Sequence, residues 1–496
     1  MQKGAGLERP NVLLICVDHW FGGLLETAGR TDIETPTLNR FCEVGTRYSR
    51  TYSETPICIP ARRTLMTGTS PRVHGDRTFQ PDLPMPDLPT LPGTFSEAGY
   101  QTYAVGKLHV YPPRDRIGFD DVILAEEGRS GLGWDDYDTY LGEQGHAGQQ
   151  FMHGMSNNEY SWRPWHLAEE HHVTNWITRE ACKTFKRRDP TRPAFWYVSY
   201  THPHPPLAPL EHYLARYANR DVQAAIQSDW SQTPEDLPAA LQTIHHYFDK
   251  LSPQRLAEVR RAFYALCTHI DHQIRLLIGT LREEQVLDNT VLAFVSDHGD
   301  MLGDHGLFAK RTMLEGSCNV PFILADTPAA ERITKGTVDT RLVGLQDIMP
   351  TLLDLANISI PETCTGCSVL GEKREHLYCE VSEGIRAQRM VTDDKFKLIW
   401  YPAGNHFQLF DIVEDPDEQF DLAGQQEHQQ EEEKLRNLLK EELYGSDLAF
   451  VEDGNLVGCP APPHSFSENR GLTGQRGLQF PPIKPADPGG VIEPKG

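Results

Sequence analysis

The sequence predicts an α/β protein with a large, mainly parallel β-sheet between helices, and a small antiparallel sheet plus a helix towards the C-terminal end. Two observations lead to this fold class. Four short apolar runs end in polar residues and are separated by helical patterns, as in layered α/β folds. Beyond about residue 372, strand-like runs follow one another with no helix between them, which is typical of an antiparallel sheet.

Each of the four apolar runs has the length and composition of a strand that is buried on both faces. They cover residues 11–17, 103–106, 194–200 and 291–296. Polar residues follow each run at its carboxyl end: Asp18, Lys107, the His202-Pro203-His204-Pro205 segment and Asp297. Because open α/β sheets bind ligands outside the carboxyl ends of their strands, we expect these four groups to converge on one site.

Helical patterns cover residues 173–187 and 255–284, between the predicted strands. Residues 124–170 differ, because they are rich in Gly, Asp, Tyr, Trp and His without a clear period. We interpret them as a long insertion over the site that shapes specificity. The predicted catalytic domain, insertion included, spans residues 1–371. The insertion's aromatic side chains either stack on a sugar or aryl ring or serve ordinary packing: Trp134, Tyr137, Tyr140, Tyr160, Trp162 and Trp165.

A C-terminal α+β subdomain is predicted for residues 372–445. Residues 446–496 are rich in Pro and Gly, so we expect an extended tail without a core of its own. Such a tail could wrap around a neighbouring subunit, which leaves a homo-oligomer open. The subdomain's strands are expected at 376–381, 389–392, 396–401 and 407–411, and its acidic helix at 426–444.

The charge balance restricts the partners. The formal net charge is -23, and an acidic surface repels nucleic acids and anionic membranes, so we expect neither as a partner. No run approaches the roughly 18 apolar residues of a membrane span, and the start has no apolar core of a signal peptide. We therefore expect a cytoplasmic protein. An anionic substrate would need positive charge gathered locally at the site.

Cys58 opens the segment Cys-Ile-Pro-Ala-Arg-Arg-Thr-Leu-Met-Thr-Gly at residues 58–68. This segment resembles the sulfatase signature, Cys-x-Pro-x-Arg followed by two apolar residues and Thr-Gly. Ile59 stands where the family commonly has a small residue, a change that removes no functional group. The resemblance covers roughly residues 10–445. It implies a formylglycine-dependent sulfatase with the alkaline phosphatase-like fold.

The resemblance also implies a mechanism. In the family, a formylglycine-generating enzyme oxidises the cysteine, here Cys58, to an aldehyde that hydrates to a geminal diol. One diol oxygen, held on a divalent cation, attacks sulfur and expels the alcohol. The other oxygen then loses its proton and ejects sulfate, so the covalent intermediate has a built-in exit that a serine would lack.

For the metal, the resemblance assigns Asp18, Asp297 and His298 as ligands, together with the oxygen derived from Cys58. Carboxylate oxygens favour Ca²⁺. The commonest arylsulfatase pattern has two adjacent aspartates, whereas this chain has Asp18-His19, and the loss of one carboxylate shifts the site towards mixed N/O ligation and leaves Mn²⁺ open. The pairing is closer to the choline-sulfatase and phosphonate monoester hydrolase branch. His19 is either a ligand or a donor to one.

The positive charge that an anion needs comes from three residues. Gly106-Lys107-Leu108-His109 resembles the family's Gly-Lys-x-His element, and Lys310 falls at its second active-site lysine. Ammonium groups beside a tetrahedral anion stabilise the charge that builds on its oxygens in the transition state. Arg62, with its fixed fork of donors, is expected to orient the diol and brace the metal carboxylates.

Histidines are the candidates for proton transfer. His109 is predicted to handle the diol proton, and His204 to protonate the leaving alcohol, a role that Lys310 could share. His305, in the same Gly-rich loop as Lys310, is explained equally well by a helix cap or a loop hydrogen bond.

The sequence therefore predicts hydrolysis of a small-molecule or carbohydrate sulfate ester to an alcohol and inorganic sulfate. The alternative is a phosphonate monoester or phosphodiester hydrolase with the same machinery, because phosphorus centres present similar tetrahedral oxygens. A catalytically silent binding protein that keeps Cys58 as a thiol is the rival from another class. The presence of both Lys107 and Lys310 argues against it, because a decayed site would not need them.

Overall fold

The structure is a computed structural model that describes residues 9–127, 135–155, 159–233, 235, 237–246, 251–328 and 332–461. Its centre is an eight-stranded sheet with strand order β4-β3-β5-β1-β6-β7-β2-β8. Neighbouring strands are parallel except around β7, which runs antiparallel to both β6 and β2. The strands are β1 (Asn11–Val17), β2 (Thr46–Tyr52), β3 (Gln101–Gly106), β4 (Asp121–Leu124), β5 (Ala194–Ser199), β6 (Thr290–Ser296), β7 (Phe322–Ala325) and β8 (Thr337–Gly344).

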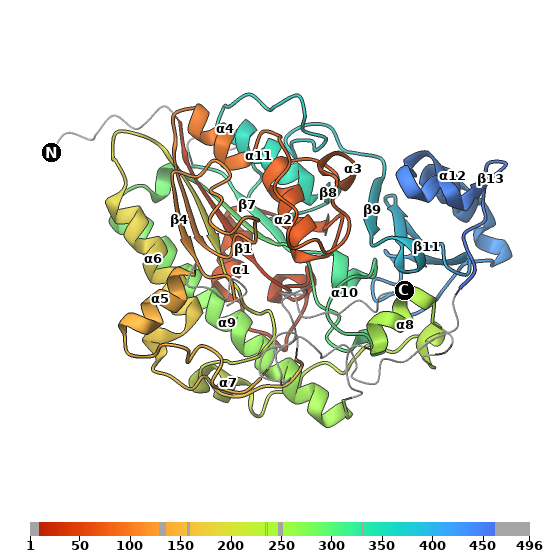
Figure 1. Cartoon of the computed structure of the whole chain (residues 1–496), viewed down its shortest axis with the longest axis horizontal. Coiled ribbons are helices and arrows are strands. Elements are labelled where there is room, and N and C mark those ends of the chain that lie inside the picture. Colours follow the sequence, from red (N-terminus) through yellow and green to blue (C-terminus); the bar gives the residue numbers. More distant parts are fainter. Residues whose placement is uncertain are drawn as a thin grey trace.

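The four predicted apolar runs form β3, β5, β1 and β6, and these strands lie side by side in the sheet. Helices cover both faces, as Figure 1 shows for α2, α4 and α11 on one side and α6 and α9 on the other. The predicted fold class is thereby confirmed. The helices are α1 (Pro36–Val44), α2 (Cys58–Thr67), α3 (Pro71–His74), α4 (Leu91–Glu97), α5 (Asp136–Glu143), α6 (Val173–Arg187), α7 (Glu211–Tyr217), α8 (Ala239–His246), α9 (Pro253–Glu283), α10 (Glu315–Cys318), α11 (Ile348–Leu355) and α12 (Gln429–Glu442).

The central strands read as unbroken apolar runs because both faces of the sheet are covered. In β1, Leu13 and Ile15 join the core beneath α1, α6 and α9, whereas Val12 and Leu14 join the core beneath α2, α4 and α11. Side chains alternate between the two faces of a strand, so each face needs its own apolar set. This two-sided burial leaves the strand ends as the places for polar residues.

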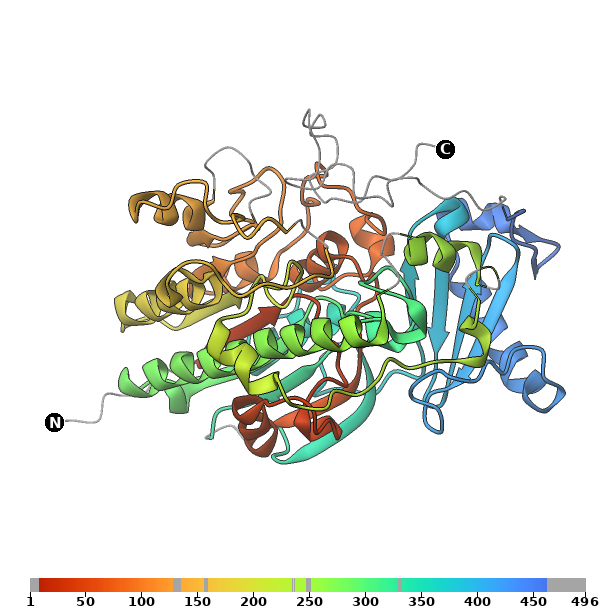
Figure 2. The ribbon, with the colours of Figure 1, turned by 90° about the horizontal axis from the view of Figure 1, so that it is seen from below.

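The C-terminal sheet is antiparallel, with strand order β12-β11-β10-β9, and it lies at one end of the molecule with α12 (Figure 2). Leu435 and Leu439 of α12 pack in one apolar cluster with Trp400 of β11. The strands are β9 (Leu377–Val381), β10 (Gln388–Thr392), β11 (Phe396–Tyr401) and β12 (His406–Asp411). Each overlaps a predicted run.

Residues 446–461 differ from the predicted extended tail. They form a 3₁₀ turn, Gly445–Phe450, and a two-stranded ribbon of β13 (Val451–Glu452) and β14 (Asn455–Leu456). The buried Asp447 holds this segment, because it accepts hydrogen bonds from Arg389 at 2.7 and 2.8 Å and from Arg77 at 2.7 Å. The rest of the predicted tail, and with it any subunit contact, lies outside the described residues. The domain boundaries stay predictions.

The predicted insertion, 124–170, contains a helix that the lack of period did not reveal. Asp135 caps α5 by accepting from the backbone N–H groups of Tyr137 and Asp138. A helix of 8 residues is too short to show a clear apolar period. Within the described part of the chain, no helix is long and apolar enough to cross a bilayer.

The last residue of β3 sets the path of the chain into Lys107. Gly106 has φ +106°, and a Cβ there would lie 1.9 Å from the carbonyl oxygen of Ser199 on β5. Gly99 has a similar φ, +89°, but open space around the same position. An alanine at Gly106 would meet both a steric clash and backbone strain, whereas an alanine at Gly99 would meet backbone strain alone.

We predict that Gly106→Ala lowers the free energy of unfolding by about 3 kcal/mol, because strain and overpacking add. Gly99→Ala should cost only the strain, about 1 kcal/mol. Urea unfolding of both variants tests this. Equal losses would show that the close approach of β3 to β5 does not constrain Gly106.

Candidate active site

The carboxyl ends of the four adjacent central strands carry the predicted site residues. Asp18 follows β1, Lys107 follows β3, and Asp297 and His298 follow β6; all four are 0% exposed. His204 lies five residues beyond the end of β5 and is also buried. Because these strands are neighbours in the sheet, the residues that follow them meet at one edge.

Cys58 is the first residue of α2, a helix whose ten residues are all buried. The helix ends at Gly68, which has φ 63° and donates its backbone N–H to the carbonyl of Thr64, a common way to end a helix. The Cys58 Sγ lies 3.2 Å from Nε2 of His298, 3.3 Å from Nζ of Lys310 and 3.8 Å from Oδ1 of Asp18. The thiol is therefore directed at the strand ends.

The environment of Cys58 favours a negative charge. Burial and the Asp18 carboxylate raise its pKa, but Lys310, Lys107 and His298 outweigh them and lower the pKa to about 7. Positive groups beside the sulfur are also the groups that an anionic ester would need.

The side chains present a set of donors that fits a divalent cation. The ligand atoms of Asp18, His19, Cys58 and His298 all lie within 4.8 Å of one another. Asp297 Oδ1 is 3.6 Å from Nε2 of His298, so a second carboxylate borders the group. Carboxylate oxygens with imidazole nitrogens form a mixed N/O set, which divalent cations such as Ca²⁺ and Mn²⁺ accept. The Cys58 sulfur stands where the oxygen of a modified residue would be.

Arg62 lies one helical turn after Cys58 and is 1% exposed. Its Nε donates to Asp297 Oδ2 at 2.8 Å, and Nη2 is 3.6 Å from Asp18 Oδ2. Nη1 donates to the backbone carbonyl of Lys107 at 2.9 Å. Arg62 is thus hydrogen-bonded to Asp297 and lies within ion-pair distance of Asp18.

The two lysines contact different parts of the site. Lys107 donates to Asp18 and, at 2.7 Å, to Oε1 of Glu127. Burial opposes ionisation of Asp18, but the Lys107 ammonium outweighs it and holds the pKa of that carboxyl well below the usual value. Lys310 Nζ lies 2.5 Å from Nε2 of His19 and contacts Cys58. Lys310 therefore contacts the thiol directly, and Lys107 lies next to it through Asp18.

His204 lies beside His19, with the ring centroids 4.4 Å apart. Its Nδ1 contacts the carbonyl oxygen of Pro205 at 2.5 Å, which fixes the proton on Nδ1 because a carbonyl can only accept. Among the described residues, Nε2 has no hydrogen-bond partner. Burial lowers the pKa of His204 well below its usual value, so the ring is neutral and Nε2 is an acceptor.

Two predicted histidines have other surroundings. The backbone N–H of His109 donates to Oε1 of Glu126 at 2.8 Å. His305 stacks on Trp230, with the ring centroids 4.8 Å apart. Its ring packs on an aromatic side chain, a role that differs from the helix cap and the loop hydrogen bond considered from the sequence.

Sequence reasoning missed two acidic residues of the site. Glu127 pairs with Lys107, and Asp300 accepts from Nδ1 of His19 at 2.6 Å. Asp300 stands three residues after Asp297, in the same turn as the predicted ligands, which is the signal that could have found it. Glu127 falls in the aperiodic insertion and carries no such signal.

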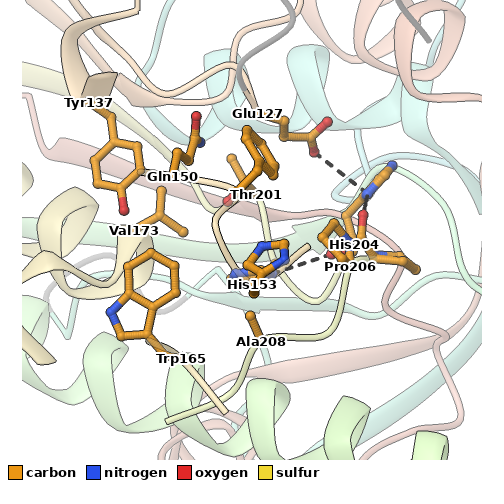
Figure 3. Close-up of a pocket in the computed structure, with 13 residues that line it drawn as sticks. Glu127, Tyr137, Gln150, His153, Trp165, Val173, Thr201, His204, Pro206 and Ala208 are labelled. Carbon is orange, nitrogen blue, oxygen red and sulfur yellow. Dashed lines mark hydrogen bonds and ion pairs between the residues drawn. The ribbon is translucent and has the colours of Figure 1, made fainter. Parts of the chain in front are cut away.

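A small pocket of about 40 Å³ lies beside the site. Figure 3 shows Glu127 and His204 at one end and Tyr137 and Trp165 at the other. No lysine or arginine is among the described residues that line it. Its lining is mainly aromatic and apolar: Tyr137, Phe151, His153, Trp165, Val173, His202, His204, Pro205, Pro206 and Ala208, with Glu127, Gln150 and Thr201. Trp134, of the predicted aromatic set, lies outside the described residues.

A buried thiol among carboxylates, imidazoles and lysines, at the carboxyl edge of an α/β sheet, is an arrangement that suits hydrolysis of esters of tetrahedral anions. Comparison with known families makes this specific. The sulfatase family model matches residues 10–358, and the model described as N-sulphoglucosamine sulphohydrolase, C-terminal, matches residues 303–444. The chain belongs to the sulfatase family, and it is a sulfuric ester hydrolase.

Relatives cover nearly the whole chain. An arylsulfatase of Clostridium perfringens is 34% identical over 474 residues, which is 91% of this chain and 98% of that protein. A choline-sulfatase of Rhizobium meliloti is 29% identical over 84% of this chain and 82% of its own length. The crystal structure of a phosphonate monoester hydrolase of Agrobacterium radiobacter has a TM-score of 0.77 at 22% identity, covering 90% of this chain and 98% of that one, and shows the fold.

We predict that Arg62→Met lowers the free energy of unfolding by about 3–5 kcal/mol, because it leaves buried carboxylates without their partner. The matched control is Arg40→Met, at an exposed pair with Glu43, with an expected change below about 1 kcal/mol. Urea unfolding in the presence of a chelator measures both. Similar losses would mean that Arg62 does not neutralise the site.

Proposed function

We propose that this sulfatase hydrolyses sulfate esters of an uncharged alcohol that carries a ring. The reaction uses a formylglycine derived from Cys58 and one divalent cation, for which Ca²⁺ is the first candidate. One observation carries the proposal. The Cys58 side chain lies within 3.8 Å of a carboxylate, an imidazole and an ammonium group at the same time. The carboxylate and the imidazole could hold a metal beside the side chain of residue 58, and the ammonium group could hold an anionic ester there.

Asp18, Asp297 and His298 are the proposed metal ligands. The cation would supply Lewis acidity, and the modified Cys58 a hydrated aldehyde as nucleophile. Arg62 contributes by orientation, because its hydrogen bond to Asp297 Oδ2 leaves the other oxygen of that carboxylate directed at His298.

Lys107 and Lys310 are proposed to hold the sulfate oxygens. Both ammonium groups are buried, at 0% and 7% exposure, so a bound ester meets them with little water between. Charge that develops on sulfate oxygens in the transition state is stabilised more strongly there than in water. This local cluster is what an acidic protein needs to bind an anion.

His204 is the proposed proton donor to the leaving oxygen. Its Nε2 is the ring nitrogen left open by the contact between Nδ1 and Pro205. An anionic ester beside the ring favours the protonated form, which would then carry a proton on Nε2. The role of His109 in handling the diol proton stays a prediction from the sequence alone.

The pocket beside His204 is the proposed site of the alcohol. Its aromatic lining and its lack of lysine and arginine suit an uncharged ring rather than a second anionic group. The name of the Clostridium perfringens relative, arylsulfatase, agrees with this choice. Aryl sulfates are therefore the substrate class that we propose.

Phosphonate monoester or phosphodiester hydrolysis is the second candidate. It is favoured by His19, which replaces a carboxylate beside Asp18 and lowers the negative charge at the cation site. We further propose maturation by a formylglycine-generating enzyme and a cytoplasmic location; the ten cysteines, all free thiols in the structure, agree with a reducing compartment.

We predict that enzyme co-expressed with a formylglycine-generating enzyme shows the thiol-to-aldehyde mass change on the Cys58 peptide. Cys58→Ala should then lose at least about 10³-fold of the activity towards 4-nitrophenyl sulfate, because the nucleophile is gone. Cys367→Ala, at an exposed cysteine, is the control that keeps its activity.

Steady-state rates on 4-nitrophenyl sulfate and on phenyl phosphonate esters then separate the two candidates. A clearly higher rate on the phosphonate esters would overturn the proposal that sulfate esters are the preferred substrates. Full activity of Cys58→Ala would instead refute the role of Cys58 on either substrate.

The pocket makes a separate prediction. Trp165→Ala should raise KM for 4-nitrophenyl sulfate about fivefold, because an aromatic contact is worth about 1 kcal/mol. KM for methyl sulfate, which has no ring, should not change. Met152→Ala, at a 66% exposed residue of the same segment, is the control. Equal effects on both substrates would place the ring elsewhere.

A further inference from the structure

His19 has buried partners on both sides of its ring. Nδ1 lies 2.6 Å from Oδ2 of Asp300, and Nε2 lies 2.5 Å from Nζ of Lys310 and 3.7 Å from Oδ1 of Asp18. His19 itself is 0% exposed and has φ 69°, a left-handed conformation that a histidine adopts at a cost. The left-handed backbone at His19 thus places the ring between Asp300 and Lys310.

These partners fix the proton of the ring. Lys310 can only donate, so it needs the lone pair of Nε2, and the Asp300 carboxylate then accepts the proton on Nδ1. Nδ1–H faces Asp300 as a result, and the Nε2 lone pair faces the cluster that contains Asp18, Cys58 and His298. This is the tautomer in which a histidine can bind a cation through Nε2, provided that the cation takes the place of the Lys310 ammonium at that lone pair and Lys310 turns to the sulfate oxygens.

Asp300 is itself held from several directions. Tyr160, from the insertion, donates its hydroxyl to Oδ2 at 2.5 Å. Oδ1 accepts from the backbone N–H groups of Leu302 at 2.9 Å and Ala309 at 3.1 Å. With both oxygens engaged, the carboxylate is not free to turn away from His19.

We propose that Asp300, held by Tyr160, is a positioning residue that makes His19 a nitrogen ligand of the divalent cation. The inference rests on the proposed cation site. Through the imidazole, Asp300 supplies the negative charge that is missing because the residue after Asp18 is not a carboxylate. A carboxylate on the far nitrogen raises the basicity of a ligating histidine and fixes its orientation.

The proposal gives the insertion a second role. Tyr160 packs against Phe308, with the ring centroids 4.9 Å apart, two residues before Lys310. The same segment that lines the pocket with Phe151 and Trp165 thus also reaches the back of the cation site through one hydroxyl.

The test is titration of the matured, chelator-stripped enzyme with CaCl₂ and with MnCl₂ in a calorimeter. Asp300→Asn should raise Kd by about 10–100-fold. Tyr160→Phe should raise it by less, in the same direction. Asp304→Asn is the matched control, because Asp304 lies in the same loop but pairs with Arg260 and should leave Kd unchanged. Urea unfolding of each stripped variant shows whether the fold is intact.

A double-mutant cycle with His19→Ala separates positioning from a distant charge effect. If Asp300 acts through His19, Asp300→Asn has no further effect on Kd in the His19→Ala protein. Equal losses in both backgrounds would overturn the inference. So would wild-type affinity of Asp300→Asn for both ions. If the wild type itself binds neither ion, the proposed cation site fails, and this outcome is distinct from a failure of Asp300 alone.

Discussion

The buried guanidinium of Arg62 is the interaction on which the geometry of the site depends. Its donors reach Asp297 after β6, the backbone of Lys107 after β3, and Ser199 at the end of β5. A buried charge with several partners is stable only while all of them keep their places. Arg62 and Cys58 stand four residues apart on α2, hence on one face of the helix, so the contacts that fix Arg62 also fix Cys58 above the strand ends.

The same cluster reconciles an acidic protein with an anionic substrate. The net charge of -23 describes the molecule as a whole, whereas the field at the site comes from Lys107, Lys310 and Arg62. These cations are buried, and Lys107 and Arg62 are paired with carboxylates. Burial reduces screening by salt, so their effect on a bound ester is local and strong. The surface can then serve solubility without weakening anion binding.

Much of the fold was predictable, because its information is local. Because β1 and β6 are buried on both faces, their sequences are continuous apolar runs that can be recognised as strands. The motif around Cys58 indicated ester hydrolysis. The contacts that the sequence did not predict join residues far apart in the chain: Asp300 contacts His19 across 281 positions, and Asp447 contacts Arg77 across 370. Such ion pairs leave no period in the sequence. A short helix such as α5 is likewise set by one cap rather than by a repeated pattern.

The burial of Cys58 has a consequence for the order of events during synthesis. The thiol is 2% exposed in the folded chain, and Lys310, which contacts its sulfur, follows it by 252 residues. At roughly 5–20 residues per second, a ribosome needs about 12–50 seconds to add that stretch. Until β6 and the loop to Lys310 have been made, the wall around the sulfur is incomplete. An enzyme that modifies Cys58, as proposed above, would therefore have a limited interval in which to reach the thiol, and rapid translation or early folding would shorten that interval.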